Sequence, residues 1–134
     1  MKLIVFLMSM GMLVYAADGY KVYQKHCMSC HVEMMEKSEV LKKFKTLKAP
    51  PMVEVSNRLK GNIILKEPDE MVKRRVVIAF IKDYIENPSI DHSMCEVGAL
   101  DNFGIMPSLK GKLSDDEREA VSQWVYDRYK GVQF

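Results

Sequence analysis

Apolar residues recur at intervals of three and four in four stretches of this chain, which is the spacing of one face of a helix. The first stretch predicts a short helix over residues 18–26, capped by Asp18. The second covers residues 40–47, has lysines on its other side and ends at Ala49-Pro50-Pro51, because proline cannot continue a helix. The apolar faces of these two stretches are Gly19, Val22 and Tyr23, and Val40, Leu41, Phe44 and Leu47.

Two further helices are predicted in the second half of the chain. Glu67-Pro68-Asp69-Glu70 has the early proline and acidic residues of a helix start, and Asn87-Pro88 ends that helix. Ser114-Asp115-Asp116-Glu117 has the pattern of a capping box and opens the last helix. The apolar positions are Val72, Val76, Val77, Phe80, Ile81 and Ile85 in the first of these, and Ala120, Val121, Trp124, Val125 and Tyr129 in the second.

The segments between these helices have weaker patterns. Residues 57–66 have no clear period, and Gly61-Asn62 suggests a turn. Residues 89–112 contain three glycines and a proline, and we interpret them as a long structured loop, a kind of segment that is usually functional. Runs of β-branched residues occur only inside the helical patterns. The sequence therefore predicts an all-α fold.

The first 16 residues have the pattern of a secretory signal peptide. Lys2 is followed by an apolar run, and Val14-Tyr15-Ala16 has small residues where a signal peptidase cleaves. The alternative is an uncleaved membrane anchor, but the run from Leu3 to Ala17 is shorter than the roughly 20 residues that span a bilayer. We predict cleavage after Ala16, a single domain over residues 17–134, a periplasmic location and no strong membrane binding after cleavage.

The charge of the chain is nearly balanced. Its 134 residues include 20 Lys and Arg and 18 Asp and Glu. Cleavage removes only Lys2 from this set and leaves 118 residues with a formal charge of +1. Nucleic-acid-binding proteins need a strongly basic face, so this balance argues against a nucleic acid partner.

The most specific chemistry lies in Cys27-Met28-Ser29-Cys30-His31. Two thiols three residues apart can each bond to one vinyl group of a haem, and a histidine directly after the second thiol then lies under the iron. We therefore predict one covalent c-type haem on Cys27 and Cys30, with His31 as an axial ligand to the iron. Cys95 is left over, and we expect a small buried apolar residue rather than half of an intermolecular disulfide.

A haem that only carries electrons needs a second axial ligand, and Met106 is the best candidate. It lies in Phe103-Gly104-Ile105-Met106-Pro107, where the glycine lets the backbone pass close to the ring and the proline stiffens the turn. Met52 and Met94 compete, since both lie in segments that we predict to be irregular. Two histidines are less suited, namely His26, expected at the surface, and His92, in a polar loop.

In these motifs the chain resembles the monohaem class I cytochromes c over most of residues 18–134. The resemblance implies a fold in which the first and last helices cross beside one covalently bound haem. It places Gly19 and Tyr23 at the crossing, where the glycine lets Trp124 approach closely. It also implies that the Pro50 carbonyl accepts a hydrogen bond from the imidazole of His31, and such an acceptor orients a metal-binding histidine.

Two segments depart from the family pattern. The stretch from His31 to Pro50 is longer than in the smallest members, with a lysine-rich insertion, and residues 90–102 are unusual. Both leave the expected fold intact and alter the surface around the haem.

The resemblance implies a soluble one-electron carrier between a reductase and an oxidase, not an enzyme, with no residue acting as acid, base or nucleophile. Three alternatives remain open. A haem enzyme or gas sensor would need an open sixth position on the iron. A thioredoxin-like disulfide oxidoreductase would need a strand before the Cys27–Cys30 pair, and a zinc site would need a fourth ligand. The basic residues that could contact an acidic redox partner are Lys42, Lys43, Lys45, Lys48, Lys73, Arg74 and Arg75.

Overall fold

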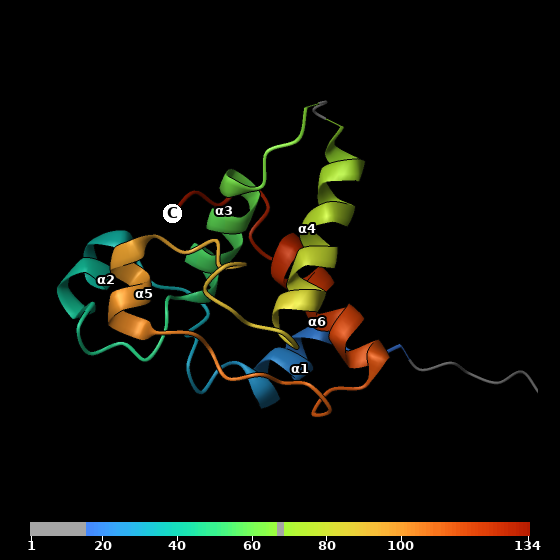
Figure 1. The fold of residues 1–134 in the computed structure, drawn as a ribbon, viewed down its shortest axis with the longest axis horizontal. Helices are drawn as coiled ribbons and strands as arrows, with labels where there is room; N and C mark the ends of the chain where they lie inside the picture. The colour runs from blue at the N-terminus through green and yellow to red at the C-terminus, as the bar shows by residue number, and fades with distance from the viewer. Residues whose placement is uncertain (1–15, 67–68) are drawn as a thin grey trace, which may run out of the picture.

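Helices form all the regular structure in residues 16–66 and 69–134, which the computed structural model describes, and no strand occurs there (Figure 1). The expected all-α fold is therefore confirmed. The signal peptide predicted over residues 1–16 lies, except for Ala16, outside the described residues. The helices are α1 (Gly19–His26), α2 (Lys37–Lys43), α3 (Met52–Asn62), α4 (Glu70–Tyr84), α5 (Val97–Phe103) and α6 (Asp115–Asp127).

The first and last helices are packed against each other. α1 begins after Asp18, whose carboxylate accepts a hydrogen bond of 3.0 Å from the Tyr20 amide. Gly19 then lies against α6, where a Cβ atom would be 2.3 Å from the Ala120 carbonyl oxygen and 2.6 Å from the Trp124 Cβ. One turn later the Tyr23 ring stacks on the Trp124 ring, with 4.5 Å between centroids. Only glycine fits at position 19 at this separation of the helices.

The core is formed where α1, α3 and α4 pack on α6. Since α6 is the shared partner of these three helices, it is the central element of the core. The capping box predicted at its start is confirmed, because Ser114 and Glu117 each bond the other's backbone amide. The buried core residues are Val22, Tyr23, Met52, Val53, Leu59, Ile63, Val77, Ile78, Ile81, Val121, Val125, Tyr126 and Tyr129.

The prediction that residues 57–66 form an irregular segment was largely wrong. Residues 57–62 belong to α3, which starts directly after Pro51, and the expected turn at Gly61-Asn62 is the last turn of this helix. The helix buries only a narrow stripe, and one member of that stripe is polar. Ser56 is fully buried, and its hydroxyl donates a 2.7 Å hydrogen bond to the Val125 carbonyl of α6. A serine in the buried stripe weakens the apolar period on which the prediction relied.

The predicted loop over residues 89–112 also contains a helix. α5 has no fully buried residue, so its apolar pattern is faint. It is held against the segment after α2, since the Asn102 side chain donates to the Phe44 carbonyl at 2.8 Å. The Phe103 and Phe44 rings meet edge to face with centroids 5.0 Å apart. Figure 1 shows α2 and α5 together at one end of the molecule.

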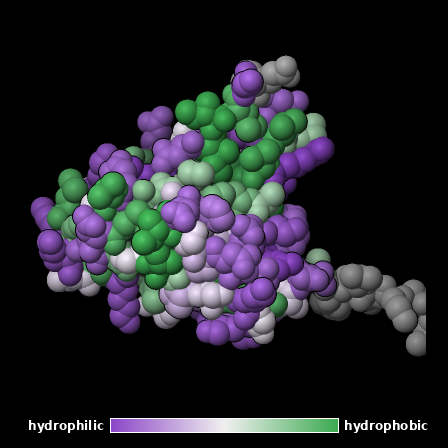
Figure 2. All heavy atoms as spheres, in the orientation of Figure 1, coloured by the Kyte–Doolittle hydropathy of each residue, from purple (hydrophilic) through white to green (hydrophobic). Residues whose placement is uncertain are grey.

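Three positions assigned to apolar helix faces are exposed. Leu41 of α2 is 69% exposed, because this two-turn helix buries only Val40. Val72 and Val76 are exposed in the first half of α4, which extends beyond α6 in Figure 1. Figure 2 shows apolar surface over this part of α3 and α4. None of the helices in the described residues has the length and apolar character needed to cross a membrane.

We predict that Gly19→Ala lowers the free energy of unfolding by about 2–3 kcal/mol, because the new methyl group collides with the backbone of α6. Denaturant titration followed by circular dichroism measures this change. Gly98→Ala is the matched control, since Gly98 is also in a helix and a Cβ atom there meets nothing within 4 Å. Equal stability of the two variants would contradict the close contact between α1 and α6.

Candidate functional site

The two cysteines of the Cys27–His31 motif lie in a turn that ends α1. The Cys27 amide continues the helix by donating to the Tyr23 carbonyl at 2.9 Å, and the His31 amide donates back to the Cys27 carbonyl at 2.9 Å. Cys27 is half-buried against the core, whereas Cys30 is exposed. Burial, with the neighbouring Cys30, raises the pKa of the Cys27 thiol to about 11. Both thiols are free, and no disulfide forms among the described residues.

Besides its amide bond to Cys27, His31 makes two further hydrogen bonds, one through its ring and one through its backbone carbonyl. Its ring Nδ1 lies 2.7 Å from the Pro50 carbonyl oxygen, which can only accept. Nδ1 therefore carries the proton, and the lone pair is on Nε2. The Tyr23 hydroxyl donates to the His31 carbonyl at 2.6 Å. Burial lowers the pKa of the imidazole, which keeps it in the neutral form that a metal needs.

The chain after His31 is attached to the start of α3. The amides of Met52 and Val53, which lack partners inside their own helix, donate to the Val32 and Glu33 carbonyls at 2.7 and 3.2 Å. These bonds place the prolines before α3 beside the imidazole. The contact between His31 and Pro50 thus rests on the beginning of a helix rather than on a free loop.

A large, mainly apolar pocket opens beside this histidine. It encloses about 1230 Å³ of space, part of which is open to solvent. α3, α4 and α5 each contribute a wall, and the segments around Met94 and Met106 close the remaining sides. Its residues include Cys30, His31, Pro50, Met52, Val55, Leu59, Phe80, Ile81, Tyr84, Ile85, Met94, Ala99, Phe103, Ile105 and Met106.

The residues of this pocket fit a haem. Its walls are apolar, like the macrocycle, and they include a thiol, a neutral imidazole with a free lone pair and several thioethers. Sulfur and imidazole are the ligands that proteins use for haem iron. Cys27 does not line the pocket and lies just behind Cys30 in the same turn.

All three candidate methionines line the same pocket. Met52 is buried in the first turn of α3 and belongs to the hydrophobic core. Met94 packs partly against that core, and its carbonyl accepts a 2.9 Å hydrogen bond from Asn62. Met106 lies in the segment after Gly104, whose φ of 68° ends α5. The two histidines that the sequence disfavoured, His26 and His92, do not line the pocket.

Two expectations about burial, those for Cys95 and His26, were wrong. Cys95 is exposed rather than buried and lies at the pocket, because the segment around it runs along the rim. His26 is only partly accessible, and its Nε2 atom is buried with no hydrogen-bond partner among the described residues.

The sequence did not single out Arg58, which lines the pocket from α3. Its guanidinium pairs with Glu96 on the rim segment and, at 3.5 Å, with Glu54 one turn earlier. These contacts attach the segment with Met94 and Cys95 to α3. Glu54 and Arg58 are four residues apart, a spacing that indicates an ion pair on a helix. This signal for Arg58 could be used only if α3 was recognised as a helix.

The alternatives based on thiol or zinc chemistry find no support in this geometry. A helix precedes the Cys27–Cys30 pair, whereas a thioredoxin-like site follows a strand. Within residues 16–66 and 69–134, no cluster of three or more His, Cys, Asp or Glu side chains could hold a metal ion.

Comparison with known proteins agrees with this site. A family model described as cytochrome c oxidase, cbb3-type, subunit III, matches residues 15–125. An uncharacterized protein of Aquifex aeolicus (strain VF5) is 37% identical over 145 residues, which cover 97% of this chain and 90% of that protein. No solved structure gave a significant match. With its all-helical fold and its haem-sized pocket beside the Cys27–His31 motif, the chain belongs to the cytochrome c family of haem-based electron-transfer proteins and has the class I fold.

Proposed function

We propose that this chain is a periplasmic one-electron carrier with a single haem, bonded covalently to Cys27 and Cys30 and ligated by His31 and Met106. The observation that carries the proposal is the state of His31. Its Nδ1 donates a hydrogen bond to the Pro50 carbonyl, which leaves Nε2 free to bind a metal. The residue also lines an apolar pocket that contains Met106. The haem supplies the redox chemistry, and the chain supplies ligation, burial and orientation.

The pocket suits electron transfer better than acid–base chemistry. Its two carboxylates, Glu54 and Glu96, are both paired with Arg58, and no unpaired acid or imidazole apart from His31 lies among its described lining residues. Apolar walls and a thioether ligand both favour the reduced, less charged iron, which raises the reduction potential relative to a site with two histidines.

Met106 is favoured over its competitors by the position of each side chain. Met52 begins α3 and bonds through its amide to the segment after His31, so it lies on the histidine side of the pocket. Met94 belongs to the shell around the hydrophobic core. Met106 is absent from that shell and lies in an irregular segment at the pocket wall, where its thioether is not committed to core packing.

The proposed partners are a reductase and an oxidase that meet the chain in the periplasm. The family description, that of an oxidase subunit, supports a respiratory setting. Among the basic residues named above, Lys43 pairs with Glu39 and Arg74 with Asp127. The other five members of this set form no ion pair with described residues and remain the better candidates for contact with an acidic surface, namely Lys42, Lys45, Lys48, Lys73 and Arg75.

Replacement of both motif cysteines by alanine is expected to abolish covalent haem. Wild-type protein made with cytochrome c maturation machinery should keep its haem after unfolding and acid extraction, and the Cys27→Ala/Cys30→Ala variant should lose it. Cys95→Ser is the matched control, because this exposed thiol lies outside the motif and should not affect retention. The mass of each unfolded chain measures the outcome. Haem that is extracted from the wild type would contradict the covalent bond.

Met106→Leu is expected to remove the sixth ligand while keeping the side-chain volume. The wild type should show the weak far-red ferric band of a methionine ligand and a ferrous spectrum unaffected by carbon monoxide. The variant should lose that band and bind carbon monoxide. Met52→Leu and Met94→Leu test the competing ligands by the same spectra. If Met52→Leu or Met94→Leu lost the band while Met106→Leu kept it, the replaced methionine would be the ligand instead of Met106. Carbon monoxide binding by the wild type would favour a haem sensor or enzyme.

The mature protein is expected to begin at Ala17. Mass spectrometry of the protein from the periplasmic fraction, after expression of the full chain, measures the N-terminus directly. A retained Met1 would instead indicate an uncleaved anchor.

A further inference from the structure

The segment that carries Met106 is short and is fastened at both ends. On one side, the Gly104 amide donates to the Leu100 carbonyl at 2.8 Å and closes α5, which is itself bonded to the end of α2. On the other side, Ser108 and Leu109 attach to the end of α4. Only residues 105–107 lie between these two attachments, and we call them the strap.

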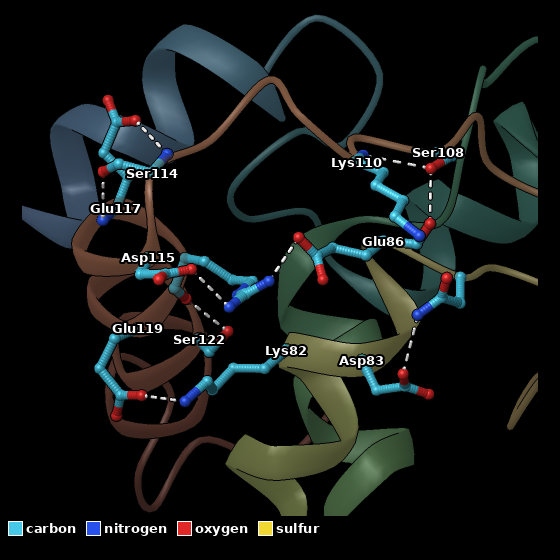
Figure 3. Close-up of polar contacts among 12 residues, drawn as sticks. Lys82, Asp83, Glu86, Ser108, Lys110, Ser114, Asp115, Glu117, Glu119 and Ser122 are labelled. Carbon is cyan, nitrogen blue, oxygen red and sulfur yellow. Dashed lines mark hydrogen bonds and ion pairs between the residues drawn. The ribbon is translucent and has the colours of Figure 1, made fainter.

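The attachment after Met106 uses backbone carbonyls that the end of α4 leaves without partners. The Ser108 hydroxyl donates to the Glu86 carbonyl at 2.5 Å, and the Leu109 amide donates to the Ile85 carbonyl at 2.8 Å. The Lys110 amide in turn donates to the Ser108 hydroxyl at 3.1 Å, as Figure 3 shows. Leu109 is buried, so this end of the strap is fixed by packing as well.

The end of α4 is in turn fixed to α6 by an ion pair. The Glu86 carboxylate pairs with the Arg118 guanidinium, which also contacts Asp115 at 2.7 Å. The side chains of Glu86 and Arg118 are both more than three-quarters buried. This ion pair is therefore less exposed to solvent than the other ion pairs between α4 and α6, Lys82–Glu119 and Arg74–Asp127. The strap is therefore connected through Glu86 to the helix that packs on α1 and its Cys27–His31 motif.

We propose that Ser108 and Glu86 are positioning residues that hold the Met106 thioether at the iron. This inference rests on the proposed ligation by Met106. A thioether is a weak ligand, so its occupancy depends on how closely the chain confines it. Loss of the Ser108 hydroxyl would leave only the Leu109 bond at this end of the strap, so the thioether would be less closely confined.

Lys82 and Glu119 offer a matched control. This pair, at 2.5 Å, also joins α4 to α6 and lies one turn before Glu86 (Figure 3). It has no bond to the strap among the described residues. Lys82→Gln therefore removes an ion pair between the same two helices without releasing Met106.

The test uses the ferric haem protein and imidazole, which competes with methionine for the sixth position. Loss of the far-red band during titration gives the imidazole affinity, and denaturant titration gives the stability of each variant. Ser108→Ala and Glu86→Gln should each bind imidazole about fivefold more tightly than the wild type, in line with the loss of one hydrogen bond or ion pair. Ser108→Thr, which keeps the hydroxyl, and Lys82→Gln should bind imidazole like the wild type.

Three results would overturn the proposal, and they differ from one another. Unchanged imidazole affinity in Ser108→Ala and Glu86→Gln, with the band present, would remove their positioning role and leave Met106 ligation standing. An equal increase in Lys82→Gln would show that any weakening between α4 and α6 has the same effect. Absence of the band from the wild type would refute Met106 ligation and this inference together.

Discussion

The contact between α1 and α6 at Gly19 is the constraint on which the rest of the structure depends. The backbones approach so closely that a single methyl group would collide with the Ala120 carbonyl. This approach lets the Tyr23 and Trp124 rings stack and allows the Tyr23 hydroxyl to reach the His31 carbonyl. Burial raises the pKa of Tyr23 to about 12, so the phenol stays protonated as the donor of that bond. The position of the motif is therefore determined by how two helices pack.

The two proposed iron ligands are attached to this frame in different ways. His31 follows α1 within one turn, and its ring is oriented by a proline that precedes α3. Met106 lies in an irregular segment between α5 and the last helix, and the Ser108 bond to Glu86 connects this segment through Arg118 to α6. The imidazole is thus held by short-range structure, whereas the thioether depends on a series of contacts between distant parts of the chain.

Much of this could be predicted from the sequence, because the relevant signals are local. The Cys27–His31 motif, the cap at Asp18 and the capping box at Ser114 each involve residues that are neighbours along the chain. α3 was missed because its buried stripe includes Ser56, whose burial depends on an acceptor 69 residues away. α5 was missed because it buries no residue fully.

The choice among the three methionines, and the exposure of Cys95, depend on packing between segments that are distant in sequence. Three methionines reach one pocket, and no spacing along the chain separates them. The packing of α1 on α6 also has a consequence for the order of folding. Gly19 and Trp124 are about a hundred residues apart, so the core cannot close until nearly the whole chain has been synthesised. Until α6 arrives, the Tyr23 ring lacks the Trp124 ring on which it stacks, so the turn after α1 takes its final position, with Cys27 half-buried, only late in folding.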